Sequence, residues 1–258
     1  MKISKIFLYD ELAIPEIQIE RLSKFLKENF SVDVEIRDSI FKNLPDSLAR
    51  DLASIRVFKP RKPFERHEPT LEEIEFEKIY GNDTTKLENI VYYDGFEMQK
   101  IITGLIPNEE LLEEYFHIIF TNRLTCTYDY NDYRYHGRAL IGSNPSIIST
   151  TGIIEAPAKP REYYVELISN MTQGLNLDSV NKKYAGTYLE YHDKRLSNVV
   201  EGYLLQALFY YLTGEAFCDS RDCRLHNAHW QKDLLYSQLE FGKLCQKHQE
   251  IFKSLEMT

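Results

Sequence analysis

The sequence has 258 residues, of which 43% are hydrophobic and 28% are charged, and its formal net charge is −9. This length and apolar content suffice for a sizeable buried core and permit a single large domain. The acidic balance argues against nucleic acid as the main partner, because binding to a phosphate backbone depends on a positive surface field.

The N-terminal segment and the apolar runs indicate where the protein resides. The apolar run at residues 3–9 is too short for a signal peptide, and no small-residue cleavage site follows it. No run approaches the roughly 20 apolar residues that span a bilayer. We therefore expect a cytoplasmic protein without a membrane partner, in a compartment where thiols bind metals more often than they form disulfides.

Apolar periodicity and turn residues predict alternating strands and helices along the chain. The predicted strands are residues 3–9, 32–37, 89–93, 117–121 and 146–154. The predicted helices are residues 15–30, 46–56, 71–80, 108–115, 161–171 and 199–213. Residues 58–69 are rich in proline and charge and predict a loop.

The element order favours an α/β (α+β) fold with a mixed sheet and a mostly helical C-terminal region. We expect one domain over residues 1–258, within which residues 1–110 and 111–258 could form two portions. Asn198 with Glu201 three residues later indicates the start of the 199–213 helix, and Gly214 supplies a left-handed stop.

Residues 126–136 concentrate tyrosines, aspartates and a histidine. Such side chains can stack and hydrogen-bond in a binding cleft, but tyrosines that alternate along an exposed loop or edge strand also pack with their hydroxyl groups in water. His117 stands between Phe116 and Ile118 and is expected to be a core histidine.

The C-terminal region contains two close pairs of metal-binding residues. Cys218-x4-Cys223 and Cys245-x2-His248 are separated by 21 residues that include a predicted helix. Zinc takes four ligands in a tetrahedron, and two short pairs on two turns meet that requirement. The sequence therefore predicts one closed structural Zn²⁺ site, with the cysteines as its firmer part. His226 or His229, within the spacer, could replace His248.

The spacing around the 199–213 helix resembles the signature of the archaemetzincins, which are zinc-dependent peptidases of the metzincin type. That signature reads His-Glu-x2-His-x2-Gly-x2-His-Cys, then x4-Cys-x-Met, then x17-Cys-x2-Cys. Aligned on the cysteines, Gly214 takes the place of the glycine and His248 stands where the last cysteine would be. Residues 137–142 and 147–150 resemble that family's glycine-containing strand and its neighbour. The resemblance implies a metzincin-like fold with a zinc-binding region at 214–250.

The same alignment replaces the catalytic residues. Ala207, Tyr211 and Phe217 stand in the positions of the three histidines, Leu208 replaces the glutamate base, and Leu225 replaces the methionine. Without imidazoles or a carboxylate, a metal-bound water has neither its site nor its proton acceptor. The resemblance thus implies an inactive peptidase homologue, with no catalytic and no cofactor-binding residue beyond the structural zinc ligands.

We therefore expect a non-catalytic, zinc-stabilised protein that binds a peptide or a partner protein in what remains of a peptidase cleft. One alternative is a hydrolase that uses other residues, either in the segment Tyr128–His136 near Tyr211 or at His192 and Asp193. Another alternative is a second, open metal site formed by His226, His229 and Asp233.

Overall fold

The computed structural model describes residues 3–80 and 90–256. Its central element is a five-stranded sheet with the strand order β2-β1-β4-β8-β7. Strands β2, β1, β4 and β8 pair in parallel, whereas β7 is antiparallel to β8 and forms one edge. The strands are β1 (Lys5–Tyr9), β2 (Asp33–Arg37), β4 (Tyr115–Thr121), β7 (Leu140–Ile141) and β8 (Ser146–Ser149).

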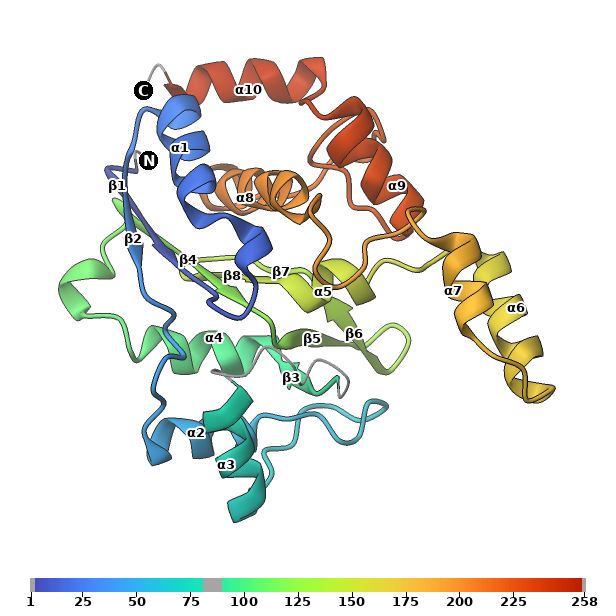
Figure 1. Cartoon of the computed structure of the whole chain (residues 1–258). Helices are drawn as coiled ribbons and strands as arrows, with labels where there is room; N and C mark the ends of the chain where they lie inside the picture. The colour runs from blue at the N-terminus through green and yellow to red at the C-terminus, as the bar shows by residue number, and fades with distance from the viewer. Residues whose placement is uncertain (1–2, 81–89, 257–258) are drawn as a thin grey trace.

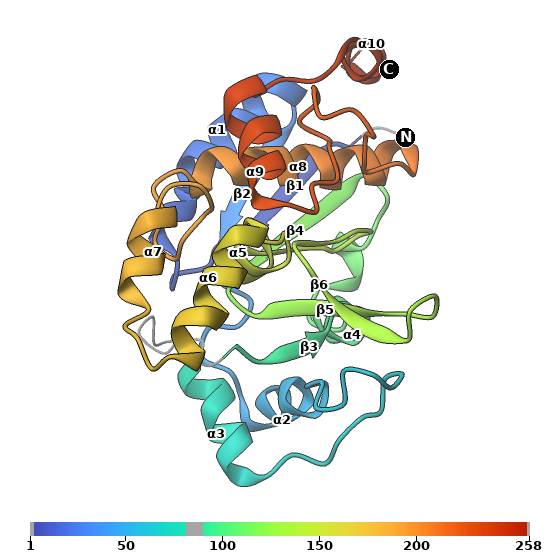
Figure 2. The ribbon, with the colours of Figure 1, turned by 90° about the vertical axis from the view of Figure 1, so that its right-hand side faces the viewer.

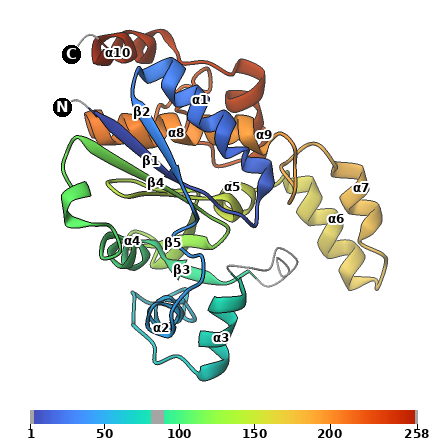
Figure 3. The ribbon, with the colours of Figure 1, turned by 60° about the vertical axis from the view of Figure 1, so that its left-hand side comes forward.

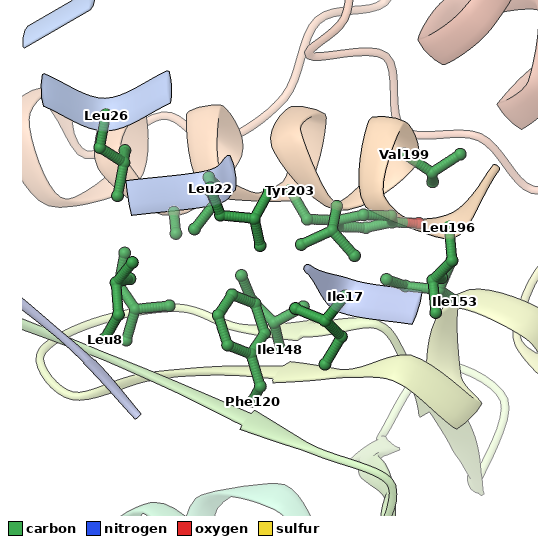
Figure 4. Packing of buried hydrophobic residues seen from close by; sticks show 14 of the residues in the cluster. Leu8, Ile17, Leu22, Leu26, Phe120, Ile148, Ile153, Leu196, Val199 and Tyr203 are labelled. Atoms are coloured by element: carbon green, nitrogen blue, oxygen red, sulfur yellow. The ribbon is translucent and has the colours of Figure 1, made fainter. Parts of the chain in front are cut away.

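Two helices cover one face of this sheet. Ile6 and Leu8 of β1 belong to the same buried cluster as apolar residues of α1 (Ile19–Phe30) and α8 (Leu196–Thr213). Figure 4 shows Leu22 of α1 above the sheet residues, and Figure 1 shows both helices on the same side of the sheet. This arrangement explains why α8 is apolar on nearly every side: it is enclosed by the sheet and by neighbouring helices.

The opposite face of the sheet supports a second core. Phe7 and Tyr9 alternate with the residues named above, as the two-residue period of a strand requires. They lie in a cluster with apolar residues of α2 (Asp46–Ser54) and α4 (Gly95–Thr103). Because both faces are buried, β1 reads as a continuous apolar run rather than as an alternating strand.

A smaller sheet lies beside the second core. It has the order β3-β5-β6, with β3 (Tyr92–Asp94) parallel to β5 (Leu124–Asp129) and β6 (Arg134–Arg138) antiparallel to β5. Figure 2 shows the β5–β6 hairpin extending away from the rest of the molecule.

A buried ionic group fastens helix α3 (Leu71–Tyr80) to this layer. Glu77 of α3 has no exposed surface and accepts hydrogen bonds from the guanidinium groups of Arg56 and Arg123, at 2.6 and 3.1 Å. The Tyr93 hydroxyl of β3 donates to the same carboxylate at 2.8 Å. A buried carboxylate is tolerated here because charged and polar donors surround it.

Helices dominate the C-terminal part of the chain. They are α5 (Thr150–Glu155), α6 (Arg161–Thr172), α7 (Asp178–Tyr184), α8, α9 (Gln231–Leu235), a π-helix (Tyr236–Phe241) and α10 (Gln246–Glu256). Short 3-10 turns occur at Pro15–Ile17 and Asn108–Glu110. Figure 3 shows α6 and α7 projecting from the body as a helical pair. Among the described helices, none combines the length and apolar content of a membrane-spanning segment.

The structure confirms the mixed α/β fold and most of the predicted elements. β1, β2 and β4 overlap the strands predicted at 3–9, 32–37 and 117–121, and α3 has the predicted bounds of 71–80. The C-terminal stop of α8 is also confirmed: Gly214 has φ 80° and donates its N–H to the Tyr210 carbonyl at 2.8 Å. His117 is a core residue with no exposed surface.

Several predicted boundaries are wrong. The predicted 15–30 helix is interrupted at Gln18, which adopts a left-handed conformation between the 3-10 turn and α1. Residues 108–115 form only a short 3-10 turn before β4 begins. The predicted strand at 89–93 begins outside the described residues, and its observed part is β3 at 92–94.

Two further predictions are wrong, and in both the side chains have other hydrogen-bond partners than the prediction assumed. The strand predicted at 146–154 ends at Ser149, whose hydroxyl accepts the Gly152 N–H and starts helix α5. Asn198 does not begin α8, which starts at Leu196. Its side chain instead accepts a hydrogen bond from Arg21 of α1, and Glu201 also pairs with Arg21, at 2.8 Å.

Candidate metal centre and adjoining cleft

Helix α8 leads directly into the candidate metal centre. After Gly214 the chain forms a loop that contains Cys218 and Cys223, continues through α9 and the π-helix, and turns at Gly242. Cys245 precedes α10, and His248 lies in its first turn. The predicted helical spacer between the two ligand pairs is therefore present.

The structure brings all four predicted ligands together. The sulfur atoms of Cys218, Cys223 and Cys245 and a ring nitrogen of His248 lie within 4.8 Å of one another. His248 Nδ1 is 3.1 Å from the Cys245 sulfur and 3.6 Å from the Cys223 sulfur. His226 and His229 are not part of this group, so the arrangement uses His248 as the fourth residue.

These separations fit a tetrahedral zinc ion. Typical Zn–S and Zn–N bond lengths place the ligand atoms of a Cys3His site roughly 3.5–3.8 Å apart. The observed spacings lie close to that value, and thiolates with one imidazole are a ligand set that zinc prefers. Four protein ligands leave no open position for a substrate, so the arrangement suits a structural ion rather than a catalytic one.

Burial shapes the acid–base properties of the ligands. It raises the pKa of the Cys223 thiol to about 12. Burial also opposes ionisation of Cys245, but hydrogen bonds from the His248 backbone and the neighbouring thiols outweigh it and lower the pKa of Cys245. Burial lowers the pKa of His248, which favours the neutral imidazole that a metal requires.

An apolar shell surrounds the ligand cluster. Leu205 and Phe209 of α8 form one buried group with Leu225 and Cys223. The Phe209 ring meets the His248 ring edge to face, with centroids 5.6 Å apart. Leu225, which stands where the archaemetzincin signature has methionine, is thus a core residue behind the cysteines.

A cleft of about 430 Å³ adjoins the metal centre. One wall is formed by the end of β6 and by β7, the edge of the main sheet, and another by α8. The loop after α8 supplies the third wall through Phe217, His226 and His229. The His226 ring lies next to the Cys218 carbonyl, 3.3 Å from Nδ1 to oxygen, so the metal centre and this wall share one loop.

Helix α8 presents Tyr203, Gln206 and Tyr210 to the cleft. Ala207, which the resemblance to the archaemetzincin signature sets at the position of a histidine, is fully buried in the main core. Tyr211 stacks on Phe116 with ring centroids 4.5 Å apart. The Tyr211 hydroxyl donates to the Glu113 carbonyl at 2.7 Å.

Sequence reasoning missed Gln206 and the cleft residues around it. Gln206 is the only amide in the apolar stretch 199–212, and this isolated polar group was a signal that could have identified it. Its side chain is buried and reaches the His226 carbonyl at 3.3 Å, which connects α8 to the loop. The remaining cleft residues lie on β6 of the smaller sheet and β7 of the main sheet, and no local pattern reveals that these strands line one cleft with α8.

The alternative enzymatic groups are dispersed. His136 pairs with Asp132 at 2.9 Å, and Asp129 lies close enough to complete a three-residue group on the β5–β6 hairpin. The Tyr135 hydroxyl donates to Asp94 instead. Tyr211 contacts Phe116 of β4 and the Glu113 carbonyl, as described above, and is not part of the group formed by Asp129, Asp132 and His136.

The other predicted pairs also have separate partners. His192 lies 3.1 Å from Glu16, whereas Asp193 pairs with Arg195 at 2.7 Å. Asp233 pairs with Arg221 at 3.0 Å. Within residues 3–80 and 90–256, His226, His229 and Asp233 do not form a three-residue metal group.

Comparisons with known proteins place the chain in a family. Archaemetzincin from Methanopyrus kandleri is similar in structure, with a TM-score of 0.48 and 10% identity, covering 100% of this chain and 97% of that one. A zinc-dependent peptidase from Methanocorpusculum labreanum (strain Z) has a TM-score of 0.43 and 11% identity, covering 96% and 99%. A comparison with curated proteins gave no match.

A family model matches residues 2–255, which is almost the entire chain. The metallopeptidase relationship that the cysteine and glycine spacing predicts is thereby confirmed at the level of the family. The chain belongs to the family described as "Probable metallopeptidase family (DUF6775)".

Proposed function

We propose that this protein is a non-catalytic member of its metallopeptidase family, which holds one structural zinc ion and binds a peptide or protein segment in the cleft beside it. Cys218, Cys223, Cys245 and His248 would hold the ion, and the bound metal would contribute folding energy. The cytoplasm, where thiols stay reduced, suits this role.

The observation that carries the proposal is the composition of the cleft. Peptide hydrolysis at zinc needs an open metal site and a nearby carboxylate that accepts a proton from the attacking water. Among the described residues, those that line the cleft include no aspartate, no glutamate and no cysteine. Of the described residues that line the cleft, His226 and His229 alone are of a common metal-binding type, and two ligands do not hold zinc tightly.

The substitutions in the catalytic motif also support a non-catalytic role. Ala207 and Leu208 are buried apolar residues, and burying them avoids the cost of unpaired imidazoles in a site without metal. The family description and the two cleft histidines favour one competing function, a hydrolase with a second, weakly held metal at His226 and His229.

Metal content distinguishes the two functions. We expect a zinc-to-chain ratio near one, measured by elemental analysis, that mild chelation does not lower until the protein unfolds. Two metals per chain, one of them readily removed with loss of a peptidase activity, would instead support the hydrolase.

Two cysteine substitutions make a matched test of the structural site. Cys223 and Cys126 are both buried, but only Cys223 belongs to the cluster. Cys223→Ala should lose zinc and melt at a lower temperature, by roughly 6–12 °C if the loss is about 3 kcal/mol. Cys126→Ala should retain a full complement of zinc. If Cys223→Ala keeps its zinc, the assignment of this ligand is wrong.

A further inference from the structure

The cleft differs in charge from the rest of the molecule. The chain has 40 aspartate and glutamate residues and a net charge of −9. None of the described residues that line the cleft is acidic, yet Arg138 of β6 is among them. A local excess of positive charge within an acidic protein focuses the field at that point and favours an anionic ligand.

Arg138 is oriented by the protein but not neutralised by it. It is half-buried, and its Nε donates to the Thr127 hydroxyl on the neighbouring strand at 2.8 Å. Among the described residues, no carboxylate lies within ion-pair distance of Arg138. The bond to Thr127 fixes the plane of the guanidinium. Its two terminal nitrogens donate to no carboxylate of the described residues, so they remain available to bind the carboxylate of a ligand.

The buried arginines of the described residues follow a different pattern. Arg56 and Arg123 pair with Glu77, and Arg224 pairs with Glu201. Even Arg134, an exposed residue of the same strand β6, pairs with Asp132 at 2.7 Å. Arg138 is half-buried in the cleft wall and less hydrated than an arginine at the open surface, so a carboxylate that enters the cleft can pair with it more strongly than at the surface.

Aromatic side chains lie along the same cleft. Phe96, Phe217 and Tyr210 line it and remain 55%, 47% and 40% exposed. Large apolar groups exposed together are typical of binding surfaces, because a ligand that covers them removes their apolar area from water. The cleft thus combines one anchoring cation with apolar surface.

From this combination we infer that the cleft takes a peptide segment with a carboxylate, which pairs with Arg138, next to an apolar side chain, which packs on Phe217 and Phe96. This inference rests on the proposed peptide-binding function and specifies its ligand. The carboxylate has two sources, an acidic side chain or the C-terminus of the peptide. Arg138 is a specificity-determining residue for either source.

Four short peptides separate these sources. We would titrate the zinc-loaded full chain with N-acetylated pentapeptides of sequence Ala-Ala-Phe-X-Ala, where X is Glu or Gln and the C-terminus is either a free acid or an amide. Affinities come from calorimetry or NMR. The doubly neutral peptide should bind on the order of tenfold more weakly than at least one singly charged peptide, because a charged hydrogen bond is lost. The singly charged peptide that binds more tightly shows whether the carboxylate comes from a side chain or from the C-terminus.

Arg138→Gln and Arg134→Gln provide the matched variants. Both residues lie on β6, but only Arg138 lines the cleft. Arg138→Gln should bind all four peptides with similar, weak affinity, and Arg138→Lys should recover part of the preference for charge. Arg134→Gln should keep the wild-type preference. Melting temperature and zinc content show whether Arg138→Gln is correctly folded. If it is not, Arg138→Lys replaces it in the comparison with the wild type.

The outcomes separate this inference from the function on which it rests. If the wild type binds the peptides without preference for a carboxylate, the cleft binds peptides and the assigned role of Arg138 is wrong. If the preference persists in Arg138→Gln, another group reads the charge and the inference also fails. If no peptide binds to the wild type, the peptide-binding function and the inference fail together.

Discussion

His117 of β4 illustrates how one buried side chain makes folding depend on pH. Its Nε2 lies 2.8 Å from the Glu110 carbonyl, which can only accept, so Nε2 carries a proton and Nδ1 accepts from the Tyr9 hydroxyl at 3.2 Å. The Tyr9 oxygen in turn accepts from Arg37 at 3.1 Å. This chain of bonds, with Phe7 stacked on the ring, requires a neutral imidazole.

Stability should therefore fall in mild acid. Burial lowers the pKa of His117 below 6.5, and nearby Arg37 adds to the effect, whereas the hydrogen bond to the Glu110 carbonyl and the charge of the Glu110 carboxylate oppose it. Well above pH 6.5, His117 is neutral in both the folded and the unfolded chain, and its contribution to stability is fully present. Between pH 6.5 and the lower pKa of the folded state, only the unfolded chain binds the proton, so this contribution is lost as the pH falls. The slope is at most about 1.4 kcal/mol per pH unit for one group.

Denaturant unfolding at pH 7.5 and pH 5.5 measures this effect. The wild type should lose more stability between the two values than His117→Asn, which cannot titrate. An NMR titration that places the His117 pKa at or above 6.5 would contradict the expectation.

At the scale of elements, the junction of β8 and α5 shows where local pattern and tertiary structure disagree. The isoleucines and threonines of residues 146–154 favour a strand. However, the Ser149 hydroxyl donates to the Arg123 carbonyl at 2.7 Å and caps α5 by accepting from Gly152. The contact with Arg123 comes from a segment more than 20 residues away, so a local pattern could not reveal it.

Gly152 lets α5 approach the strand that forms the cleft wall. A Cβ atom at this position would lie 2.1 Å from the Arg138 carbonyl oxygen, a backbone atom that cannot rotate away. Gly152→Ala should therefore lower the free energy of unfolding by about 1–3 kcal/mol. It should also weaken peptide binding, because the displaced backbone belongs to Arg138.

Gly137 is the control for this substitution. It lies on β6 and lines the cleft, but the nearest atoms to an added Cβ are 3.5 Å away, an ordinary contact. Gly137→Ala should fold with stability close to that of the wild type in thermal melts. If the two alanine variants melt at the same temperature, the close approach at Gly152 is not a constraint on the fold.

Across the whole molecule, the sequence predicts what depends on local patterns. The buried strand β1, the helix α8 with its Gly214 stop, and the two ligand pairs all follow from short-range spacing. The cleft does not, because its walls come from β6 of the smaller sheet, β7 of the main sheet and α8, and no short-range pattern brings these elements together. The role proposed for Arg138 depends on this arrangement and on the lack of acidic residues among the described residues that line the cleft.

The separation between the proposed zinc site and the two apolar cores predicts how the molecule responds to loss of metal. The ligands connect residues 218–223 to residues 245–248, whereas the main sheet is held by two apolar cores on its faces. Removing zinc with a strong chelator should release the C-terminal loop and leave β1 and β4 protected. Hydrogen exchange measured by mass spectrometry should rise in residues 214–250 and change little in the sheet.

Peptide affinity should fall at the same time, since the cleft residues Phe217 and His226 belong to the released loop. Peptide affinity and protection of residues 214–250 should therefore be lost together as zinc is removed, and both should return when zinc is restored. Exchange that rises equally in β1 and β4 would mean that the ion supports the whole fold. Unchanged peptide affinity after complete zinc removal would mean that the loop holds its place without the metal, through contacts such as the one between Gln206 and the His226 carbonyl.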